Sequence, residues 1–194
     1  RVESVDRSVL LDWSQPQAQT IVTPAMSYLM AHVLSDEPAR WNSLGRSNAL
    51  EIGRPAGVKV GQTSDGRDAW VVGFTPSYVV ATWTGVRGES DAVTPRFPAV
   101  LWNALMQTAS ENTPADGWTA PLGVSTMTVC DPSGMLPTRE CPNLVTEVFL
   151  NGSEPTQADT MFREFSINRE TGLLATVFTP PELIDNRVYM LVPE

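Results

Sequence analysis

The side chain best suited to polar chemistry in this sequence is Lys59. Of the 13 basic residues, Lys59 is the one lysine and the other 12 are arginines. A lysine offers a compact ammonium that the planar guanidinium of arginine does not imitate, so a single lysine points to a site that needs such a charge. The alternative is chance within an arginine-rich composition. The residues around Lys59 favour the first interpretation.

Other catalytic chemistries have few candidate residues. His32 is the only histidine, and Cys130 and Cys141 are the only cysteines. A zinc site would need both cysteines to meet the distant His32, which fits no usual ligand spacing, so we expect no metal and no other cofactor. A Ser-His-Asp triad would need His32, but this residue falls in a predicted helix, off its apolar stripe. We expect it to be a surface or boundary histidine.

The segment that begins at Lys59 resembles an active-site motif. Residues 59–63 read Lys-Val-Gly-Gln-Thr, and residues 67–76 read Arg-Asp-Ala-Trp-Val-Val-Gly-Phe-Thr-Pro. This run is similar to the Lys-Thr-Gly-Thr-Thr motif of penicillin-binding proteins and to the Arg-Asp-Ala-Trp-Phe-Val-Gly-Tyr-Thr-Pro that continues it. Lys-x-Gly alone would be a weak match, but the extended run, preceded by Gly-Arg-Pro-Ala, is a strong one. Residues 114–194 resemble an extension that follows the transpeptidase domain in some bifunctional members.

This resemblance implies acyl transfer from a D-alanyl-D-alanine stem peptide, the reaction that β-lactams intercept. A serine attacks the penultimate carbonyl, and two backbone N–H groups stabilise the oxyanion. In the family the second N–H comes from the fourth motif position, here Gln62. Lys59 would place positive charge near the substrate carboxylate and should therefore be solvent-accessible on its strand. The expected substrate-binding residues are Val60, Gly61 and Thr63, with Gly61 leaving room for substrate against the strand.

The motif departs from the family in three respects. Val60 and Gln62 replace hydroxyl residues, so Thr63 alone keeps a hydroxyl. Ser-x-x-Lys, which supplies the nucleophile, is absent, because Ala56 stands three residues before the only lysine. Ser-x-Asn occurs at residues 110–112 and 166–168, but the family's copy precedes the lysine, so both are coincidental. The nucleophile and its general base are not in this sequence, and we expect the chain alone to be inactive.

Cys130 and Cys141 bracket an Asp-Pro-Ser-Gly turn signal at residues 131–134. In an extracytoplasmic protein they would form a disulfide that closes a short loop, contributing roughly 3 kcal/mol in the chain-entropy model. Two reduced, buried thiols are the alternative.

Composition narrows the class of protein further. Charged residues make up 18% and apolar residues 42%, with 16 prolines, which favours a loop-rich β or α+β protein. The net charge of −9 repels phosphate backbones, so nucleic acid is not an expected partner. No apolar run approaches the ~18 residues of a membrane span. The start lacks the blocks of a signal peptide, so we expect a soluble chain cut from a membrane-anchored parent.

Periodicity predicts a hairpin in residues 2–13 and a helix in residues 23–34 that begins with Thr23 as N-cap and Pro24. The helix should bury Met26, Leu29, Met30 and Val33. A loop over residues 36–55 should follow, and no internal repeat is evident. The remaining expected elements are strands at 58–62, 69–74 and 78–84, a helix at 95–111, and short strands at 124–129, 145–150, 162–167 and 188–192.

The expected fold class is therefore α+β: part of a serine-transpeptidase/β-lactamase-like antiparallel sheet with flanking helices, followed by a small β-rich extension. We expect residues 1–113 to form the C-terminal part of a transpeptidase domain and residues 114–194 a second domain. The leading hypothesis is a fragment of a peptidoglycan D,D-transpeptidase that acts on the extracytoplasmic face of the cytoplasmic membrane. The alternative is a non-catalytic module that binds cell-wall peptide or protein through a degenerate motif.

Overall fold

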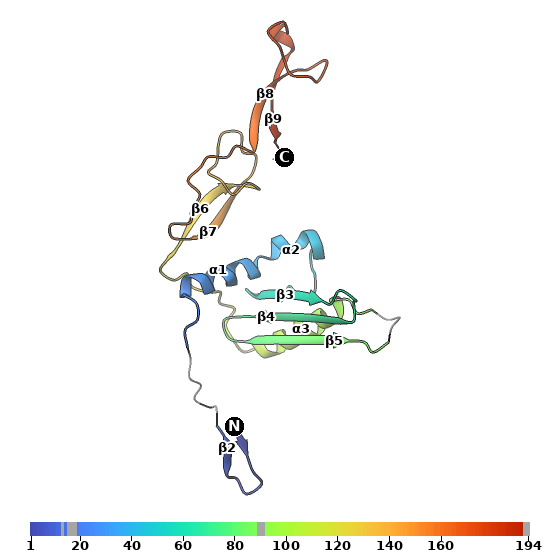
Figure 1. The fold of residues 1–194 in the computed structure, drawn as a ribbon, viewed down its shortest axis with the longest axis vertical. Coiled ribbons are helices and arrows are strands. Elements are labelled where there is room, and N and C mark those ends of the chain that lie inside the picture. Colours follow the sequence, from blue (N-terminus) through green and yellow to red (C-terminus); the bar gives the residue numbers. More distant parts are fainter. Residues whose placement is uncertain (13, 15–18, 89–91, 192–194) are drawn as a thin grey trace.

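The structure is a computed structural model, and it describes residues 1–12, 14, 19–88 and 92–191. A three-stranded sheet with helices occupies the middle of the molecule, an N-terminal hairpin lies at one end, and two further hairpins extend from the other (Figure 1). The mixture of helices and antiparallel sheets confirms the α+β class. No helix among the described residues is long and apolar enough to cross a membrane.

The N-terminal hairpin and the first helix follow the predicted positions. β1 (Val2–Glu3) pairs antiparallel with β2 (Val9–Leu11), while residue 13, the expected end of this hairpin, lies outside the described residues. α1 (Pro24–Ser35) begins where expected, because the Thr23 hydroxyl oxygen accepts the Met26 N–H at 3.3 Å. The predicted N-cap is thus confirmed.

The buried face of α1 was predicted wrongly. Met26, Met30 and Val33 are exposed, whereas Ala31 is buried and His32 is half-buried. α1 lies against β3 and β7. Of the four residues predicted to be buried, only Leu29 is partly covered, and the methionines have no cover among the described residues. His32 at the boundary is as expected.

The predicted loop over residues 36–55 contains a helix. α2 (Glu37–Leu44) starts with Asp36 as N-cap, whose carboxylate accepts the Ala39 N–H at 3.2 Å, and Pro38 lies in its first turn. It ends at Gly45, which has a φ of 78°. Asp followed by proline two positions later was the available signal, and it was outweighed by the turn-forming residues nearby.

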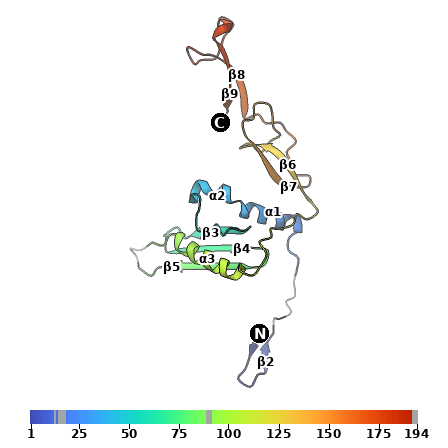
Figure 2. The ribbon, with the colours of Figure 1, turned by 180° about the vertical axis from the view of Figure 1, so that it is seen from behind.

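The central sheet has the order β3-β4-β5 and is antiparallel throughout. Its strands are β3 (Gly57–Gln62), β4 (Asp68–Phe74) and β5 (Val79–Gly85), which confirms the three predicted strands. α3 (Arg96–Ser110) covers one face of the sheet, as Figure 2 shows from behind. The core on this side consists of Leu50, Ala56, Val58, Val71, Ala99, Trp102 and Met106.

Two contacts fix the position of α3 and of the segment that follows it. A Cβ added to Gly73 would lie 2.4 Å from Cζ2 of Trp102, so only glycine allows this indole to pack on β4. The Arg54 guanidinium donates to the hydroxyl and the carbonyl oxygen of Thr113 and to the Pro114 carbonyl oxygen, at 3.0 to 3.3 Å. The segment after α3 is therefore anchored to the loop that leads into β3.

The C-terminal part consists of two hairpins. β6 (Val124–Cys130) pairs with β7 (Leu144–Leu150), and β8 (Phe162–Asn168) pairs with β9 (Ile184–Met190), both antiparallel. The first three strands lie where they were predicted. β9 begins four residues before the predicted start at residue 188 and ends at Met190, while residue 192, the predicted end, lies outside the described residues. A short 3₁₀ helix, η1 (Pro181–Leu183), leads into β9.

The two hairpins are copies of one another, a repeat that the sequence analysis did not detect. At an offset of 38 residues, Gly134 matches Gly172 and Leu136 matches Leu174, and both glycines have φ near 70°. The same backbone hydrogen bonds recur at the matched positions. The Cys130 N–H bonds to the Met135 carbonyl oxygen as the Asn168 N–H does to Leu173, and the Cys141 N–H bonds to Thr138 as the Thr179 N–H does to Thr176. From the second strand of each hairpin onward the offset is 40 residues. The Asp131 N–H bonds to Asn143 as the Arg169 N–H does to Leu183, and the Asn151 N–H bonds to Gly123 as the Leu191 N–H does to Met161.

The segment between the two copies is held by Asp159, which is buried. Its carboxylate accepts the Phe162 N–H at 2.9 Å, at the start of β8. Burial works to raise the pKa of Asp159, but the nearby Ser133 hydroxyl and the backbone N–H groups of Phe162 and Met161 outweigh it and hold the pKa below its ordinary value. Of the two carboxylate oxygens, Oδ1 is buried without a hydrogen-bond partner in the part of the chain that the structure describes. The ionised carboxylate therefore stabilises this junction.

Candidate active-site strand

Lys59 lies on β3, the outer strand of the sheet, and its side chain is exposed, as expected. Side chains alternate along a strand, so Lys59 and Gly61 face away from α3 while Val58 and Val60 face the core. The Lys59 ammonium donates to the Val60 carbonyl oxygen at 3.2 Å. The charge is thus presented to solvent rather than neutralised in a buried ion pair.

The backbone N–H of Gln62 points away from the sheet. Thr63 donates its N–H to the Asp68 carbonyl oxygen at 2.9 Å, which makes these two residues a hydrogen-bonded pair. Hydrogen-bonded and non-hydrogen-bonded positions alternate in an antiparallel ladder, so the backbone groups of Gln62 turn to the outer edge of β3. An oxyanion donor at the fourth motif position is geometrically available there.

Val60 and Gln62, which differ from the family motif, both have side chains that contact other residues of this chain. Val60 packs against the core, and the Gln62 side-chain amide donates to the Val93 carbonyl oxygen. Gly61 has open space where a Cβ would stand, so nothing in this chain itself requires glycine there. The room beside Gly61 remains free for a group from outside the chain.

Thr63 is held in the turn that joins β3 to β4. Its hydroxyl donates to the Asp65 carboxylate at 2.6 Å and accepts the Asp68 N–H at 3.0 Å. The bond from the Thr63 hydroxyl is the largest cause of a lowered pKa at Asp65, and the bond from the Arg67 N–H is the next. The one hydroxyl left in the motif therefore closes a turn in this structure.

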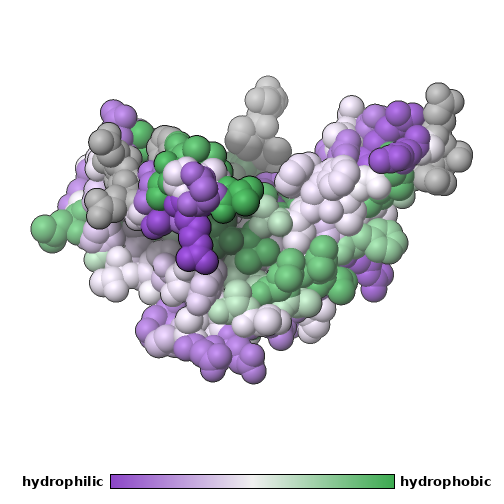
Figure 3. Space-filling model, turned by 90° about the horizontal axis from the view of Figure 1, so that it is seen from below, coloured by the Kyte–Doolittle hydropathy of each residue, from purple (hydrophilic) through white to green (hydrophobic). Residues whose placement is uncertain are grey.

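The sheet face that carries Lys59 is apolar and open. Lys59 stands opposite Val72, and Gly61 opposite Trp70, which in turn pairs with Trp83 on β5. The indole N–H of Trp83 donates to the Asp68 carboxylate at 2.8 Å. The apolar side chains exposed on this face are Trp70, Val72, Val79 and Trp83. On the other side of the sheet, α3 also exposes apolar side chains, Phe97, Val100, Leu101 and Leu105. Figure 3 shows from below where hydrophobic side chains gather on the surface of the molecule.

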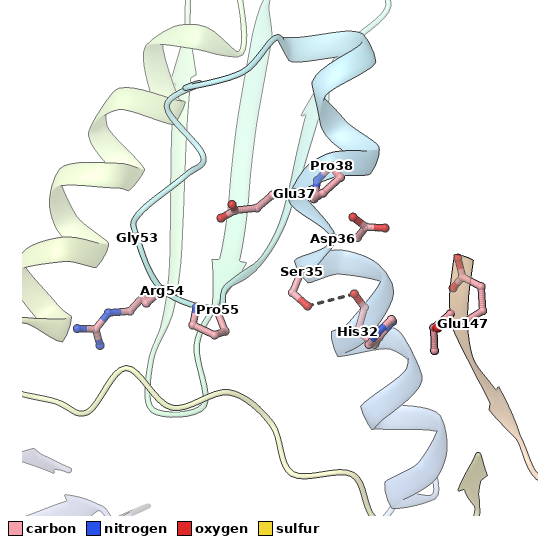
Figure 4. A pocket seen from close by; sticks show the side chains of 10 residues that line it. His32, Ser35, Asp36, Glu37, Pro38, Gly53, Arg54, Pro55 and Glu147 are labelled. Atoms are coloured by element: carbon pink, nitrogen blue, oxygen red, sulfur yellow. Dashed lines mark hydrogen bonds between the residues drawn. The ribbon is translucent and has the colours of Figure 1, made fainter. Parts of the chain in front are cut away.

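Sequence reasoning missed a cavity of about 570 Å³ between α1, the loop before β3 and β7. His32, Asp36 and Glu37 line it from the helices, with Arg54 from the loop and Glu147 from β7, as Figure 4 shows. The Ser35 hydroxyl donates to the His32 carbonyl oxygen at 3.1 Å within its wall. These residues are far apart in the sequence, so no local pattern could have joined them. A second cavity of about 920 Å³ opens beside Val60 and α3.

Cys130 and Cys141 are joined by a disulfide, with Cα atoms 5.9 Å apart. It closes the loop between β6 and β7, which lies outside the central sheet that contains β3 (Figure 1). In the second hairpin the matched positions hold Asn168 and Thr179. The described residues contain no group of three or more His, Cys, Asp or Glu side chains placed to hold a metal ion.

Comparison with known proteins gives consistent relationships. The family model of the penicillin-binding protein 1A C-terminal domain matches residues 120–164. Penicillin-binding protein 1A of Clostridium botulinum is 36% identical over 140 residues, which cover 68% of this chain and 17% of that protein. The Clostridium novyi protein of the same name is 26% identical over 190 residues, covering 94% of this chain and 22% of the relative.

Penicillin-binding protein 1A from Haemophilus influenzae is a solved structure with the same fold, with a TM-score of 0.52 and 22% identity over 71% of this chain and 22% of its own. The chain thus spans about a fifth of the length of these relatives. It belongs to the class A penicillin-binding proteins, of which it is a C-terminal portion. Within that class its similarity is to penicillin-binding protein 1A.

Proposed function

We propose that this chain forms one wall of the active site of a peptidoglycan D,D-transpeptidase. Lys59 supplies the ammonium near the substrate carboxylate, and the Gln62 N–H supplies one oxyanion donor. The observation that carries the proposal is that both groups face outward from the same strand, β3, the ammonium on the open face and the N–H at the free edge. The nucleophile, in a Ser-x-x-Lys sequence, comes from a part of the protein outside residues 1–194.

In this reaction the serine oxygen bonds to the carbonyl carbon of the penultimate D-alanine, and the carbonyl oxygen takes up negative charge that the Gln62 N–H stabilises. The peptide bond to the terminal D-alanine then breaks, and the leaving amine takes a proton. The amine of a second stem peptide attacks the acyl-enzyme and completes the cross-link. β-Lactams would acylate the serine in the first step, and the second step would not follow.

The open apolar face supports this assignment. Trp70, Val72 and Trp83 are about half exposed beside Lys59, and an apolar patch of this kind marks a surface that another part of a protein or a ligand covers. The rest of a transpeptidase domain would cover this face and place its serine across from Lys59. Residues 1–113 would thus be one part of that domain, and residues 114–194 a separate extension.

The disulfide supports an extracytoplasmic location, where such bonds form and persist. A membrane-anchored parent with the stem peptide as substrate and β-lactams as inhibitors follows from the same proposal. The net charge of −9 argues against nucleic acid as a partner.

The test is acylation of the complete protein by a fluorescent penicillin. Lys59→Ala should slow the single-turnover rate by about 10²-fold or more, the scale on which one electrostatic contact to the reacting group acts. Lys59→Arg should recover only part of that rate, because the guanidinium differs in shape. Arg67→Lys is the matched control: Arg67 is exposed in the turn after β3, and its variant should react normally. Equal rates for Lys59→Ala and the unaltered protein would refute the proposal.

A second candidate function is a non-catalytic module that binds cell-wall peptide or protein. The observation that favours it is the state of the motif hydroxyls: Val60 has none and Thr63 is engaged with Asp65, so a substrate carboxylate finds no free hydroxyl here. A complete protein that binds a D-Ala-D-Ala peptide, but is never acylated by penicillin, would establish this function instead.

A further inference from the structure

The segment that joins α3 to β6 packs against the start of β3. The Arg54 bonds to Thr113 and Pro114 fix its first residues to the loop before β3. Further along, a Cβ added to Gly117 would lie 3.6 Å from Cγ of Pro55, two residues before β3 begins. The segment thus runs along the residues that lead directly into the strand that carries the motif.

A pair of aromatic rings makes the next contact. Phe74, the last residue of β4, pairs with Gly57, the first residue of β3. A Cβ added to Gly57 would lie 2.6 Å from Cζ of Phe74, so the phenyl ring occupies the space beside Gly57. The Trp118 ring meets the Phe74 ring edge to face, with centroids 5.5 Å apart. The Phe74 ring therefore links the segment after α3 to the start of β3.

The other end of β3 is held by contacts that do not involve this segment. The turn to β4 is closed by its own hydrogen bonds, and the Gln62 side chain donates to the Val93 carbonyl oxygen. Lys59 lies two residues from Gly57, whereas Gln62 lies five residues from it. A displacement of the start of β3 would therefore move Lys59 more than Gln62.

α1 provides a second connection to the same strand. It lies between β3 and β7 and contacts both (Figure 1). A Cβ added to Gly123, the residue before β6, would lie 3.4 Å from the Cβ of Ala25 at the start of α1. The hairpin of β6 and β7 is therefore placed against the helix that contacts β3.

We propose that Trp118 is a positioning residue for Lys59. Its contact with Phe74 fixes the start of β3, and with it the place from which the ammonium is presented. The chain after α3 thus contributes to the reaction without touching substrate. This role rests on the proposed function of Lys59, and the experiment separates the two.

The experiment is a double-mutant cycle on the complete protein, measured as the single-turnover rate of acylation by a fluorescent penicillin. Trp118→Ala removes the ring contact and should slow acylation about tenfold, because a small displacement of a catalytic group is costly. In the Lys59→Ala background the same change should alter the rate less than about twofold, since Trp118 acts through Lys59. Trp118→Phe keeps an aromatic edge against Phe74 and should recover most of the rate. Leu122→Ala, in the same segment but 99% exposed, is the matched control and should react normally.

Amide hydrogen exchange of the complete protein, resolved to single residues, gives a measurement that does not depend on activity. Gly57, Lys59 and Gly61 occupy hydrogen-bonded positions, because such positions alternate with non-hydrogen-bonded ones along β3. Trp118→Ala should lower the protection of the first two amides about tenfold. The Gly61 amide, nearer the turn, should keep its protection.

Three results would overturn the proposal. Acylation of Trp118→Ala at the normal rate would show that the ring contact is not needed. An equal slowing in both backgrounds would show that Trp118 acts independently of Lys59. An equal loss of protection along the whole of β3 would show a general loss of stability instead of a local one. By contrast, a normal rate for Lys59→Ala would refute the proposed function itself, and the role of Trp118 with it.

Discussion

Removal of the Cys130–Cys141 disulfide provides a measurement with an internal control, because the second hairpin has the same fold without the bond. The two cysteines are 11 positions apart. The chain-entropy model, −2.1 − 1.5R ln n cal/mol/K, gives about 3 kcal/mol at 25 °C for a loop of this size. The double variant Cys130→Ser/Cys141→Ser should therefore lose about 3 kcal/mol of stability in the first hairpin.

Amide hydrogen exchange is the suitable assay, because it resolves each hairpin separately. The loss should lower the protection of the Cys130 and Asp131 amides, which bond to Met135 and Asn143, by about 10²-fold. The matched amides of the second hairpin should keep their protection. Thiol labelling of the unaltered native protein, made under oxidising conditions, should first find no free sulfhydryl.

Two results would refute this reasoning. Unchanged protection in the first hairpin would mean that the bond does not limit its opening. An equal loss in both hairpins would mean that they unfold as one unit, and the chain-entropy estimate for one loop would not apply. Two labelled thiols in the native protein would remove the premise itself.

Three further predictions concern the active site, the core and the linker. Incubated with a labelled penicillin, the chain should form no stoichiometric covalent adduct by intact mass, because its only lysine, Lys59, has no serine three residues before it; a single-site adduct at near-full occupancy would place the nucleophile among its own serines. Gly73→Ala should cost about 1–3 kcal/mol in urea unfolding, because its Cβ would lie 2.4 Å from Trp102, whereas Gly61→Ala should be nearly neutral in open space; equal costs would contradict the packing argument. Asp159 has a pKa below its ordinary value of 3.8, so its contribution is full above about pH 4 and is lost as the pH falls through the lower folded value. Asp159→Asn should therefore destabilise the chain at pH 7 and flatten the acid limb of its stability profile; an unchanged acid limb would show that another carboxylate controls it.

The active-site strand and the class of fold could be predicted from the sequence because their signals are local. Alternating apolar residues and turn formers predict the bounds of β3, β4 and β5, and apolar residues with a period of 3.6 predict the helix α3. The run from Lys59 to Pro76 is contiguous, so its resemblance to a known motif is visible without any structure. The exposure of Lys59 follows from the alternation of side chains along β3.

The structure alone decided features that depend on which faces meet. Met26, Met30 and Val33 form an apolar stripe on α1, yet packing against β3 left that stripe exposed. The hairpin repeat is difficult to recognise in sequence because few of its matched residues are identical. It appears as recurring backbone hydrogen bonds, which many different side chains satisfy equally well.

The roles of individual motif residues also needed tertiary contacts. The sequence assigned Thr63 to substrate, but whether its hydroxyl is free depends on Asp65 and Asp68, which the turn brings back to it. The orientation of the Gln62 N–H depends on which pairs of the ladder are hydrogen-bonded, which a shift of one residue in register would reverse. The sequence by itself determined which residues this strand carries, whereas the register and the packing decided where each one points.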